Sequence, residues 1–327
     1  MSINWSAFVD IINSHERFLL TSHIRPDCDA LGSELGMAQI LETLGKDVKI
    51  VNGHPTPPNL DFIDPTNRIY VIGETITLDE LQDREIMMIL DTSAWAQLGP
   101  MGDVLKGLDC KKIILDHHVS EDELGAEAFK NTTAEATGRL VVEAAEQLGV
   151  ELTPEMAMPI FAAMATDTGW FRFSSADGYT YRVGAHLIES GAVPSEIYNS
   201  LYEQDTAGRV RLRGTVLSRI VVELDGRFAH TYVRKNDFET TGALPSDTED
   251  AINLSLAIAG VEFAIICVEQ LTGGFKISFR SRCHLECSKI AEIFGGGGHK
   301  AAAGAFLEGE FEEVQAKVLD VVREAMR

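Results

Sequence analysis

The stretch FLLTSHIRPDCDALGS, residues 18–33, decides how the first part of this chain folds. Its apolar start is typical of a buried β-strand, whereas residues 30–44 place apolar side chains at helical spacing. Polar residues occupy the turn between the two elements. A strand that passes directly into a helix is the first half of a β-α-β unit, so the stretch predicts a sheet covered by helices.

More short apolar runs follow, and helical patterns come after them. The runs cover residues 48–52, 69–72, 86–90 and 112–115, and the helical patterns cover residues 136–148 and 154–166. Parallel strands need a crossover connection, which is usually a helix. The first part of the chain is therefore predicted to be α/β, with a mostly parallel sheet flanked by helices.

The second part of the chain has a different pattern. Residues 195–219 form a charged helical pattern that we expect to be a connector. Beyond it, strand patterns flank Asp225-Gly226 and Thr272-Gly273-Gly274, which are typical hairpin turns. Helical patterns at 251–259, 286–294 and 311–326 complete a smaller C-terminal α+β domain. The predicted domains are residues 1–195, a helical connector at 196–218, and residues 219–327.

The composition limits the partners and the location of the protein. The chain has 327 residues, a net charge of −22 and five scattered cysteines. Long nucleic acids are usually bound by basic patches, so we expect no long duplex as a partner. The N-terminus lacks the basic start and apolar core of a secretory signal, and no apolar run is long enough to span a membrane. An odd number of scattered cysteines favours a reducing, cytoplasmic location.

Polar clusters follow four of the predicted elements, at the point where each element ends. Ligands of parallel sheets bind beyond the carboxyl ends of the strands, so these clusters are expected to converge on one crevice. Taken singly, each cluster has a structural explanation: Asp27 could cap the next helix, and Asp116 could end a strand in a turn. Taken together, they are candidate metal ligands and catalytic groups: His23, Asp27, Asp29, Asp91, Asp116, His117, His118 and Asp167.

Such a gathering of carboxylates calls for cations. Several aspartates in one crevice repel one another and take up protons, whereas divalent cations remove the repulsion. Oxygen ligands with a few imidazoles suit manganese better than zinc or copper. The ligand set is large enough for a pair of ions that share one carboxylate. We therefore expect two Mn²⁺ per chain, with Mg²⁺ or Co²⁺ as substitutes.

A glycine run near the C-terminus predicts a phosphate-binding loop. Consecutive glycines let backbone N–H groups approach a phosphate, and arginine binds phosphate oxygens through paired hydrogen bonds. The alternative is a hairpin-like loop without a ligand. The candidate substrate-binding residues are Arg280, Ser281, Arg282, Gly296, Gly297, Gly298 and His299.

Two further residues follow the last polar cluster closely, and both are open to more than one explanation. Trp170 either packs at the rim of the core or stacks on a base. Arg172 is a candidate for binding a phosphate.

The polar clusters resemble the successive motifs of the DHH phosphoesterases. The matching stretches are HIRPDCDALGS, ILDTS, LDHH and ATDTGWF. GGGGH at 295–299 is similar to the signature of the DHH-associated domain that follows in oligoribonucleases and 3′,5′-bisphosphate phosphatases. The resemblance covers nearly the whole chain. Cys28 stands where the family has glycine, and Gln97 stands where many relatives carry arginine, but neither position is a metal ligand.

The resemblance implies a role for each candidate residue. One metal would be held by His23, Asp27 and Asp91. The other would be held by Asp29, Asp91, His117 and Asp167, with Asp91 bridging the two. Among the catalytic residues, His118 would face the substrate phosphate and Asp116 would orient a histidine from behind.

The resemblance also implies a hydrolase of phosphate esters. The leading hypothesis is an oligoribonuclease that releases mononucleotides from very short RNA and also converts 3′-phosphoadenosine-5′-phosphate to AMP. The alternatives are a phosphodiesterase of linear or cyclic dinucleotides, a RecJ-like single-strand DNA exonuclease, and a nucleotide sensor without activity. The expected partners are short RNA or nucleotides, with no membrane, and a homodimer is left open.

Overall fold

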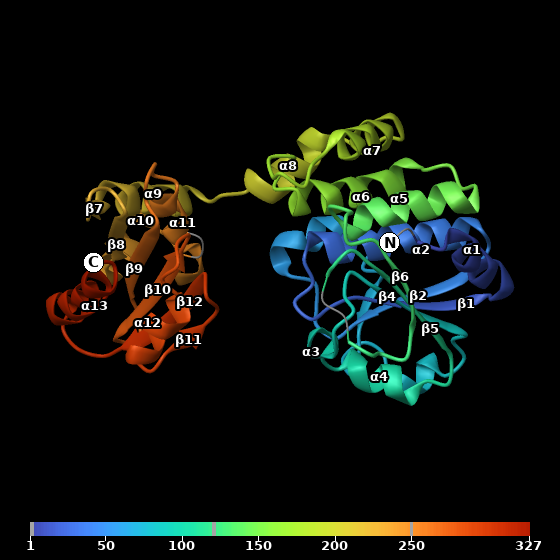
Figure 1. Ribbon diagram of the computed structural model, residues 1–327, viewed down its shortest axis with the longest axis horizontal. Helices are drawn as coiled ribbons and strands as arrows, with labels where there is room; N and C mark the ends of the chain where they lie inside the picture. Colours follow the sequence, from blue (N-terminus) through green and yellow to red (C-terminus); the bar gives the residue numbers. More distant parts are fainter. Residues whose placement is uncertain (1–2, 120–121, 249–250) are drawn as a thin grey trace. The chain divides into compact units, whose positions relative to one another are not determined.

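A computed structural model describes residues 3–119, 122–248 and 251–327 of the protein. The chain divides into two compact units, unit 1 (Met1–Glu203) and unit 2 (Gln204–Arg327), which Figure 1 colours from blue to yellow and from yellow to red. The division falls inside residues 196–218, where the sequence predicts a connector.

The single helix predicted over residues 195–219 is wrong. Helix α8 (Pro194–Tyr202) ends in unit 1, and α9 (Ala207–Ser218) begins in unit 2. A new helix begins there because the hydroxyl of Thr206 accepts the N–H of Arg209 at 3.1 Å and caps the first turn.

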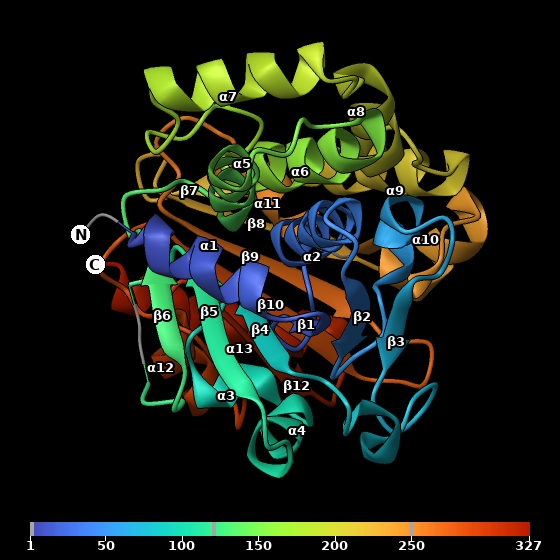
Figure 2. The ribbon, with the colours of Figure 1, turned by 90° about the vertical axis from the view of Figure 1, so that its right-hand side faces the viewer.

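Unit 1 is built on a six-stranded parallel sheet. Figure 2 shows the strands side by side in the order β3-β2-β1-β4-β5-β6. The chain moves outward from β1 to β3 and then crosses to the other side of β1, so the strand order reverses between β1 and β4. The strands are β1 (Arg17–Thr21), β2 (Asp47–Asn52), β3 (Ile69–Val71), β4 (Ile86–Leu90), β5 (Lys111–Asp116) and β6 (Glu127–Lys130).

The α/β class predicted for this part of the chain is confirmed, and β1 to β5 match the predicted strands to within one residue at each end. Strand β6 escaped prediction because it has no apolar run. Of its side chains only Phe129 is buried, and its first two residues are exposed.

Helices cover both faces of this sheet (Figure 1). Side chains of β1 alternate between the two cores: Phe18 and Leu20 join one, and Leu19 joins the other. The first face carries α1 (Trp5–Ser14), α2 (Cys28–Thr43), α5 (Thr137–Leu148) and α6 (Pro154–Asp167), with η1 (Pro58–Ile63), α7 (Gly178–Glu189) and α8 packed against them. The second face carries α3 (Trp95–Leu98), α4 (Met101–Gly107) and η2 (Leu78–Leu81).

The contact between α2 and α6 is unusually close because α2 carries two glycines at the crossing. A Cβ at Gly32 would lie 2.2 Å from the carbonyl oxygen of Pro159, and a Cβ at Gly36 would lie 2.4 Å from Cγ1 of Ile160. Helix α2 is buried along most of its length. The contact therefore fixes α2, which bears Asp29 in its first turn, against α6, which ends at Asp167.

Unit 2 contains a six-stranded sheet in the order β11-β12-β10-β9-β8-β7. Among the described strand pairs β8–β9 is parallel and the others are antiparallel. Both predicted hairpins are present, as β7–β8 and β9–β10. The glycine run, for which a hairpin-like loop was the alternative explanation, forms a third hairpin, β11–β12. The strands are β7 (Val221–Glu223), β8 (Phe228–Val233), β9 (Phe263–Glu269), β10 (Phe275–Ser281), β11 (Gly297–Gly298) and β12 (Ala302–Leu307).

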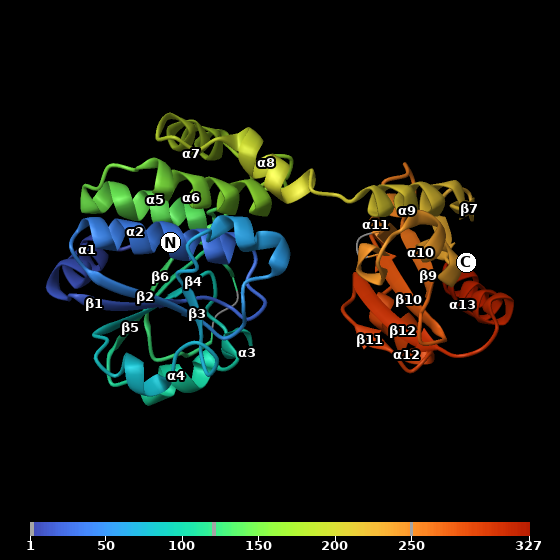
Figure 3. The ribbon, with the colours of Figure 1, turned by 180° about the vertical axis from the view of Figure 1, so that it is seen from behind.

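Helices pack on both faces of this second sheet, as Figure 3 shows, so the smaller C-terminal domain is α+β as predicted. One face carries α9, α10 (Lys235–Thr241) and α11 (Ala251–Leu256), with η3 (Pro245–Thr248) beside them. The other carries α12 (Cys287–Ile293) and α13 (Phe311–Ala325). Within the described ranges, no helix is both long enough and apolar enough to cross a lipid bilayer.

We predict that Gly32→Ala destabilises the protein, because the added Cβ collides with the backbone of α6 rather than with a flexible side chain. Overpacking of this kind typically costs about 1–3 kcal/mol. Urea unfolding followed by circular dichroism should show a lower midpoint. Gly184→Ala in α7 is the matched control, since its Cβ meets the ring of Phe171 at an ordinary 3.4 Å. Equal midpoints for the two variants would contradict the close contact of α2 with α6.

Candidate metal centre

The candidate ligands follow neighbouring strands of unit 1. His23 lies two residues after β1, Asp91 directly after β4, and His117 directly after β5. Because β1, β4 and β5 are adjacent and parallel, these residues gather at one edge of the sheet. Asp29 and Asp167 reach the same place from the first turn of α2 and the last residue of α6.

Asp91 is buried and lies between two groups of potential ligands. Its Oδ2 is 3.4 Å from Nε2 of His23, and its Oδ1 is 3.5 Å from Nε2 of His117. The hydroxyl of Thr137 donates a hydrogen bond to Oδ1 at 2.9 Å. The backbone φ of Asp91 is +61°, a conformation that costs a non-glycine residue about 1–3 kcal/mol. The fold therefore keeps a strained backbone at Asp91, the residue whose carboxylate faces both groups of potential ligands.

The first group consists of His23, Asp27 and Asp91. Nε2 of His23 is 3.7 Å from Oδ1 of Asp27, while its Nδ1 is bonded to the carbonyl oxygen of the following residue at 3.0 Å. Asp27 also caps α2, because its Oδ1 accepts the N–H groups of Asp29 and Ala30 at 3.0 and 3.1 Å. The capping role of Asp27 and its place beside His23 are therefore compatible.

The second group consists of Asp29, His117 and Asp167. Nε2 of His117 lies 3.7 Å from Oδ2 of Asp29 and 3.5 Å from Oδ2 of Asp167. Its Nδ1 is bonded to the carbonyl oxygen of Ala134 at 3.2 Å. In both groups a backbone carbonyl thus fixes Nδ1 and leaves Nε2 directed at carboxylates, which is how metal-binding imidazoles are held.

Asp29 is additionally held by the start of α5. Its Oδ2 accepts the N–H of Thr137 at 2.8 Å, and its Oδ1 accepts the N–H of Gly138 at 2.9 Å. A helix N-terminus favours a negative charge. Burial and the nearby charges of Asp91 and Asp167 nevertheless raise the pKa of Asp29 well above its ordinary value.

The donor set fits divalent cations. Within the two groups the N–O distances of 3.4–3.7 Å are longer than ordinary hydrogen bonds, as expected of atoms that share a cation. Burial, with the charges of Asp91 and Asp27, raises the pKa of Asp167 to about 6. Burial alone would lower the pKa of His23, but its polar contacts with Asp27 and Asp91 raise it to about 11. Protons on these groups thus offset the negative charge of the cluster, which bound divalent cations would otherwise offset.

Asp116 and His118 form a pair beside the two groups. Oδ1 of Asp116 lies 2.9 Å from Nδ1 of His118, and Oδ2 accepts the hydroxyl of Ser93 at 2.7 Å. Although burial opposes it, the hydrogen bonds from His118 and Ser93 lower the pKa of Asp116 to about 2. The hydrogen bond to Asp116 raises the pKa of His118, whose side chain is 48% exposed. The histidine that Asp116 orients is therefore His118.

Sequence reasoning missed a buried network beneath the turn that carries His23. Nδ2 of Asn52 donates to Oε2 of Glu34 at 2.9 Å, and Oδ1 of Asn52 accepts the N–H of Ser22 at 3.1 Å. Burial raises the pKa of Glu34 to about 8. The network joins α2 and β2 to the residue before His23. Glu34 and Asn52 belong to no polar cluster in the sequence, and they meet Ser22 only when the sheet forms.

The predicted arginines of unit 2 lie at the end of β10 and have different surroundings. Arg280 and Lys276 line a cavity of about 280 Å³. Nη1 of Arg282 instead donates to the carbonyl oxygen of Leu256 at 2.8 Å. The hydroxyl of Ser281 accepts the N–H of Cys283 at 3.3 Å. Arg280 therefore lines a cavity together with Lys276 while its Nη1 donates to the carbonyl oxygen of Phe279 at 3.1 Å, and Arg282 and Ser281 also support the local backbone.

The glycine run forms the hairpin β11–β12. Gly297 and Gly298 are its first strand, and the N–H of His299 donates to the carbonyl oxygen of Ala302 at 2.7 Å in the turn. A Cβ at Gly296 would lie 2.1 Å from the carbonyl oxygen of Gly304, so close packing by itself requires glycine there. The hairpin explanation therefore holds for the backbone, and the phosphate-binding role stays a prediction.

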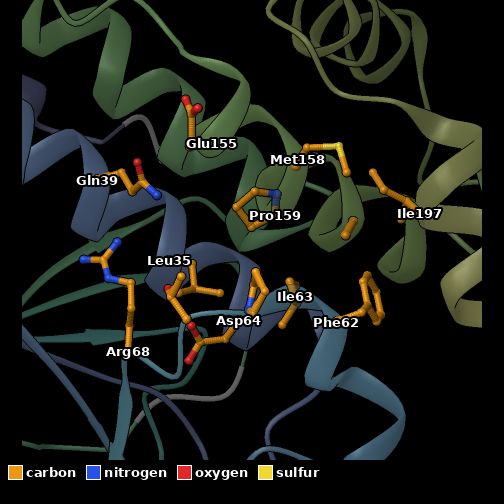
Figure 4. Close-up of a pocket in the computed structure, with 13 residues that line it drawn as sticks. Leu35, Gln39, Phe62, Ile63, Asp64, Arg68, Glu155, Met158, Pro159 and Ile197 are labelled. Atoms are coloured by element: carbon orange, nitrogen blue, oxygen red, sulfur yellow. The ribbon is translucent and has the colours of Figure 1, made fainter.

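Unit 1 also contains a cavity of about 310 Å³ that is separate from the metal centre (Figure 4). None of the candidate ligands, all of which are described, lines it. We therefore give it no part in the candidate site. Its walls are largely apolar and come from η1, α2, α6 and α8, and include Leu35, Phe62, Ile63, Met158, Pro159 and Ile197.

Comparisons with known proteins assign the chain to a family. The DHH family, N-terminal domain, matches residues 17–166, and the DHHA1 domain matches residues 225–327. The first match contains every candidate metal ligand except Asp167, which lies one residue beyond it. The chain therefore contains a DHH family, N-terminal domain and, in its C-terminal part, a DHHA1 domain.

Similar proteins of known name cover nearly the whole chain. It is 29% identical to the bifunctional oligoribonuclease and PAP phosphatase NrnA of Thermus thermophilus, over 94% of this chain and 89% of that protein. It is 26% identical to the protein of the same name from Bacillus subtilis, over 90% of each. The crystal structure of an exopolyphosphatase-related protein from Bacteroides fragilis superposes with a TM-score of 0.80 at 26% identity, over 98% of this chain and 95% of that one. Exonuclease RecJ bound to manganese shares the fold, with a TM-score of 0.53 at 13% identity, over 97% of this chain and 94% of that one.

We predict that Mn²⁺ raises the melting temperature of the protein more at pH 8 than at pH 6. The pKa of the candidate ligand His23 is raised from 6.5 to about 11 in the folded protein, so the stability that its proton contributes is present below pH 6.5 and is lost progressively as the pH rises through 8 towards 11. Cations compete with this proton, so their stabilising effect grows from pH 6 to pH 8. Scanning fluorimetry with and without Mn²⁺ measures this effect as a shift in melting temperature at each pH. Asp29→Asn should lose most of the shift, and Asp103→Asn, an exposed carboxylate variant, should keep it. Equal shifts at both pH values would count against cation binding here.

Proposed function

We propose that the chain is a divalent-metal-dependent phosphoesterase. Its substrates would be short oligoribonucleotides, which it hydrolyses to mononucleotides, and 3′-phosphoadenosine-5′-phosphate, which it converts to AMP. The observation that carries the proposal is the position of Asp91, whose two oxygens face separate histidine and aspartate groups while His118 stands beside them. Two similar proteins bear the names of both activities, which supports the choice of substrates.

In the proposed site, the two groups would hold divalent cations, with one oxygen of Asp91 directed at each group. Their oxygen-rich donors favour Mn²⁺, with Mg²⁺ or Co²⁺ as substitutes. Bound cations would supply the charge that lowers the pKa of an attacking water and neutralises the phosphate. Thr137 and Gly138 hold Asp91 and Asp29 in place through hydrogen bonds, so these ligands are oriented in advance. One cation would be held by His23, Asp27 and Asp91, and the other by Asp29, Asp91, His117 and Asp167, since Asp91 also lies 3.5 Å from His117.

His118 is the proposed contact to the substrate phosphate. Because Nδ1 of His118 is bonded to Asp116, its Nε2 is the atom left to meet a ligand. Asp116 raises the pKa of His118, so the imidazole can carry a proton and donate it to a phosphoryl oxygen or to the leaving oxygen. Asp116 itself stays ionised, because its pKa is lowered to about 2.

We assign metal chemistry to residues 1–195 and substrate binding to residues 219–327. Arg280 and Lys276 line one cavity, and two cations in one cavity suit a terminal phosphate. Ser281, Arg282, His299 and the glycines at 296–298 keep their proposed roles in binding the rest of the substrate.

The cellular setting is part of the proposal. All five cysteines lie in the described part of the chain, and none forms a disulfide, which favours a reducing cytoplasm. A homodimer remains open.

The main alternatives are a phosphodiesterase of dinucleotides and a single-strand DNA exonuclease. Both would use the same metal centre, so the distinction depends on substrate length and sugar. The net charge of −22 gives a long polyanion no attractive field, and this favours short substrates.

We predict that Asp91→Asn abolishes Mn²⁺-dependent hydrolysis of an RNA dinucleotide, with a loss of at least about a hundredfold in kcat/KM, as expected when a metal ligand or its support is removed. The melting temperature should fall little, because Asn can keep the hydrogen bond from Thr137. Asp103→Asn is the matched control at an exposed position of the same unit. Wild-type turnover by Asp91→Asn, or by protein freed of metal with chelator, would refute the proposed chemistry.

We predict that turnover peaks at roughly two to five nucleotides and falls for longer strands, because additional phosphates extend over an acidic surface and release few counterions. The measurement is kcat/KM on RNA and DNA from dimer to twenty-mer at two salt concentrations, with 3′-phosphoadenosine-5′-phosphate and a cyclic dinucleotide alongside. A rate that rises with DNA length and depends steeply on salt would favour the exonuclease. Activity confined to dinucleotides would favour the dinucleotide phosphodiesterase.

A further inference from the structure

Three aromatic side chains of unit 1 form a cluster that the proposed chemistry does not use. The ring centroid of Trp170 lies 4.9 Å from that of Tyr198 and 5.8 Å from that of Tyr202. The two tyrosine rings are 4.9 Å apart. Tyr198 is 39% exposed and Tyr202 is 47% exposed, whereas Trp170 is half-buried beneath them. We call Trp170, Tyr198 and Tyr202 the aromatic platform.

The aromatic platform adjoins the candidate metal centre at two points. Trp170 follows Asp167 by three residues, which span at most about 11 Å of chain. Helix α8, which carries Tyr198 and Tyr202, packs against α6, the helix that ends at Asp167. The ring contacts of Trp170 with the two tyrosines therefore place the platform at the end of α6 that bears Asp167.

The backbone that carries Trp170 is strained. Gly169, Trp170 and Phe171 have φ angles of +56°, +60° and +61°, and this conformation is unfavourable for the last two, which are not glycine. The N–H of Trp170 donates to the carbonyl oxygen of Ala165 at 2.6 Å, and the N–H of Phe171 donates to the hydroxyl of Thr168 at 3.0 Å. These hydrogen bonds hold a turn that the sequence would not adopt by itself. Strain of this kind gathers at functional sites.

Packing alone does not explain the exposed rings. Helix α8 is already anchored by Ile197, which is 1% exposed and belongs to the main core of unit 1. A ring needed only to hold α8 would be buried in the same way, yet Tyr202 turns 47% of its surface to solvent. The exposed side chain of Arg172 follows Trp170 by two residues on the same strained turn, where its Nε donates to the carbonyl oxygen of Gly169 at 2.7 Å. Exposed aromatic rings with a nearby cation are what nucleic-acid-binding proteins use to stack bases.

We propose that the aromatic platform is a nucleobase-binding subsite, which stacks the base of a nucleotide whose phosphate lies at the candidate metal centre. The inference rests on the proposed function, because it assumes that the phosphate binds at the candidate metal centre. Cations held by the candidate metal ligands would act only on the phosphate, so they would not distinguish a nucleotide from another phosphate ester. Stacking supplies that distinction and accepts any base, because every base has a π-face.

The test compares AMP with ribose 5-phosphate, which has the same sugar and phosphate but no base, in binding titrations with Mn²⁺. The wild-type protein should bind AMP about tenfold more tightly or better, the usual effect of one stacked base. The double variant Tyr198→Ala/Tyr202→Ala should bind both ligands equally, and Tyr198→Phe/Tyr202→Phe should keep the preference. Tyr70→Ala is the matched control, because Tyr70 is 41% exposed on the edge strand β3 of the same unit.

Equal affinity of the wild-type protein for the two ligands would overturn the subsite, and so would a double alanine variant that keeps the preference for AMP. Loss of both ligands by a folded alanine variant would mean that the rings only support Asp167, which also overturns it. If thermal melting shows that the double variant is unfolded, Tyr202→Ala at the last residue of α8 replaces it. Turnover of an RNA dinucleotide decides the proposed function separately: an inactive wild-type protein that still prefers AMP would contradict that function and leave the subsite standing.

Discussion

The repulsion among buried carboxylates around Asp91 is the constraint on which the rest of the structure depends. Asp29 and Asp91 are each 2% exposed, and with Asp167 they face the same imidazole, His117. Such a group is unfavourable without positive charge, and the raised pKa of Asp29 expresses that cost. The fold nevertheless gathers these residues, because three parallel strands end side by side and a glycine-bearing α2 fits closely against α6. The protein is thus built around a place for cations.

The surroundings of the cluster orient each ligand from a different element. Backbone carbonyls fix Nδ1 of His23 and His117, and the N–H groups at the start of α5 fix Asp29. Glu34 and Asn52 tie the turn before His23 to the helix and strand behind it. Ligands supported in this way keep their geometry while a substrate binds and leaves. The support comes from main-chain groups and buried amides, which explains why few of its members look functional in the sequence.

The phosphate and the base of a nucleotide are bound by different kinds of side chain. In the proposed function, a phosphate would be bound by charge, at the metal groups of unit 1 and at Arg280 and Lys276 of unit 2. In the proposed subsite, a base would be bound by the rings of Trp170 and the exposed tyrosines of α8. Neither kind of contact needs an extended basic surface, which agrees with the net charge of −22.

The sequence by itself determined the α/β class, the strands β1 to β5 and the candidate ligands, because buried strands need apolar runs and ligands follow the ends of strands. It could not reveal β6 or β11, which pair through backbone atoms and contain no apolar run. The tertiary structure alone decided that Asp91 presents one oxygen to each group, and that Asp27 caps α2 while facing His23. It also placed Thr137 on Asp91 across 46 residues of chain. Contacts of such long range depend on how the helices pack on the sheet, and no local pattern of residues encodes them.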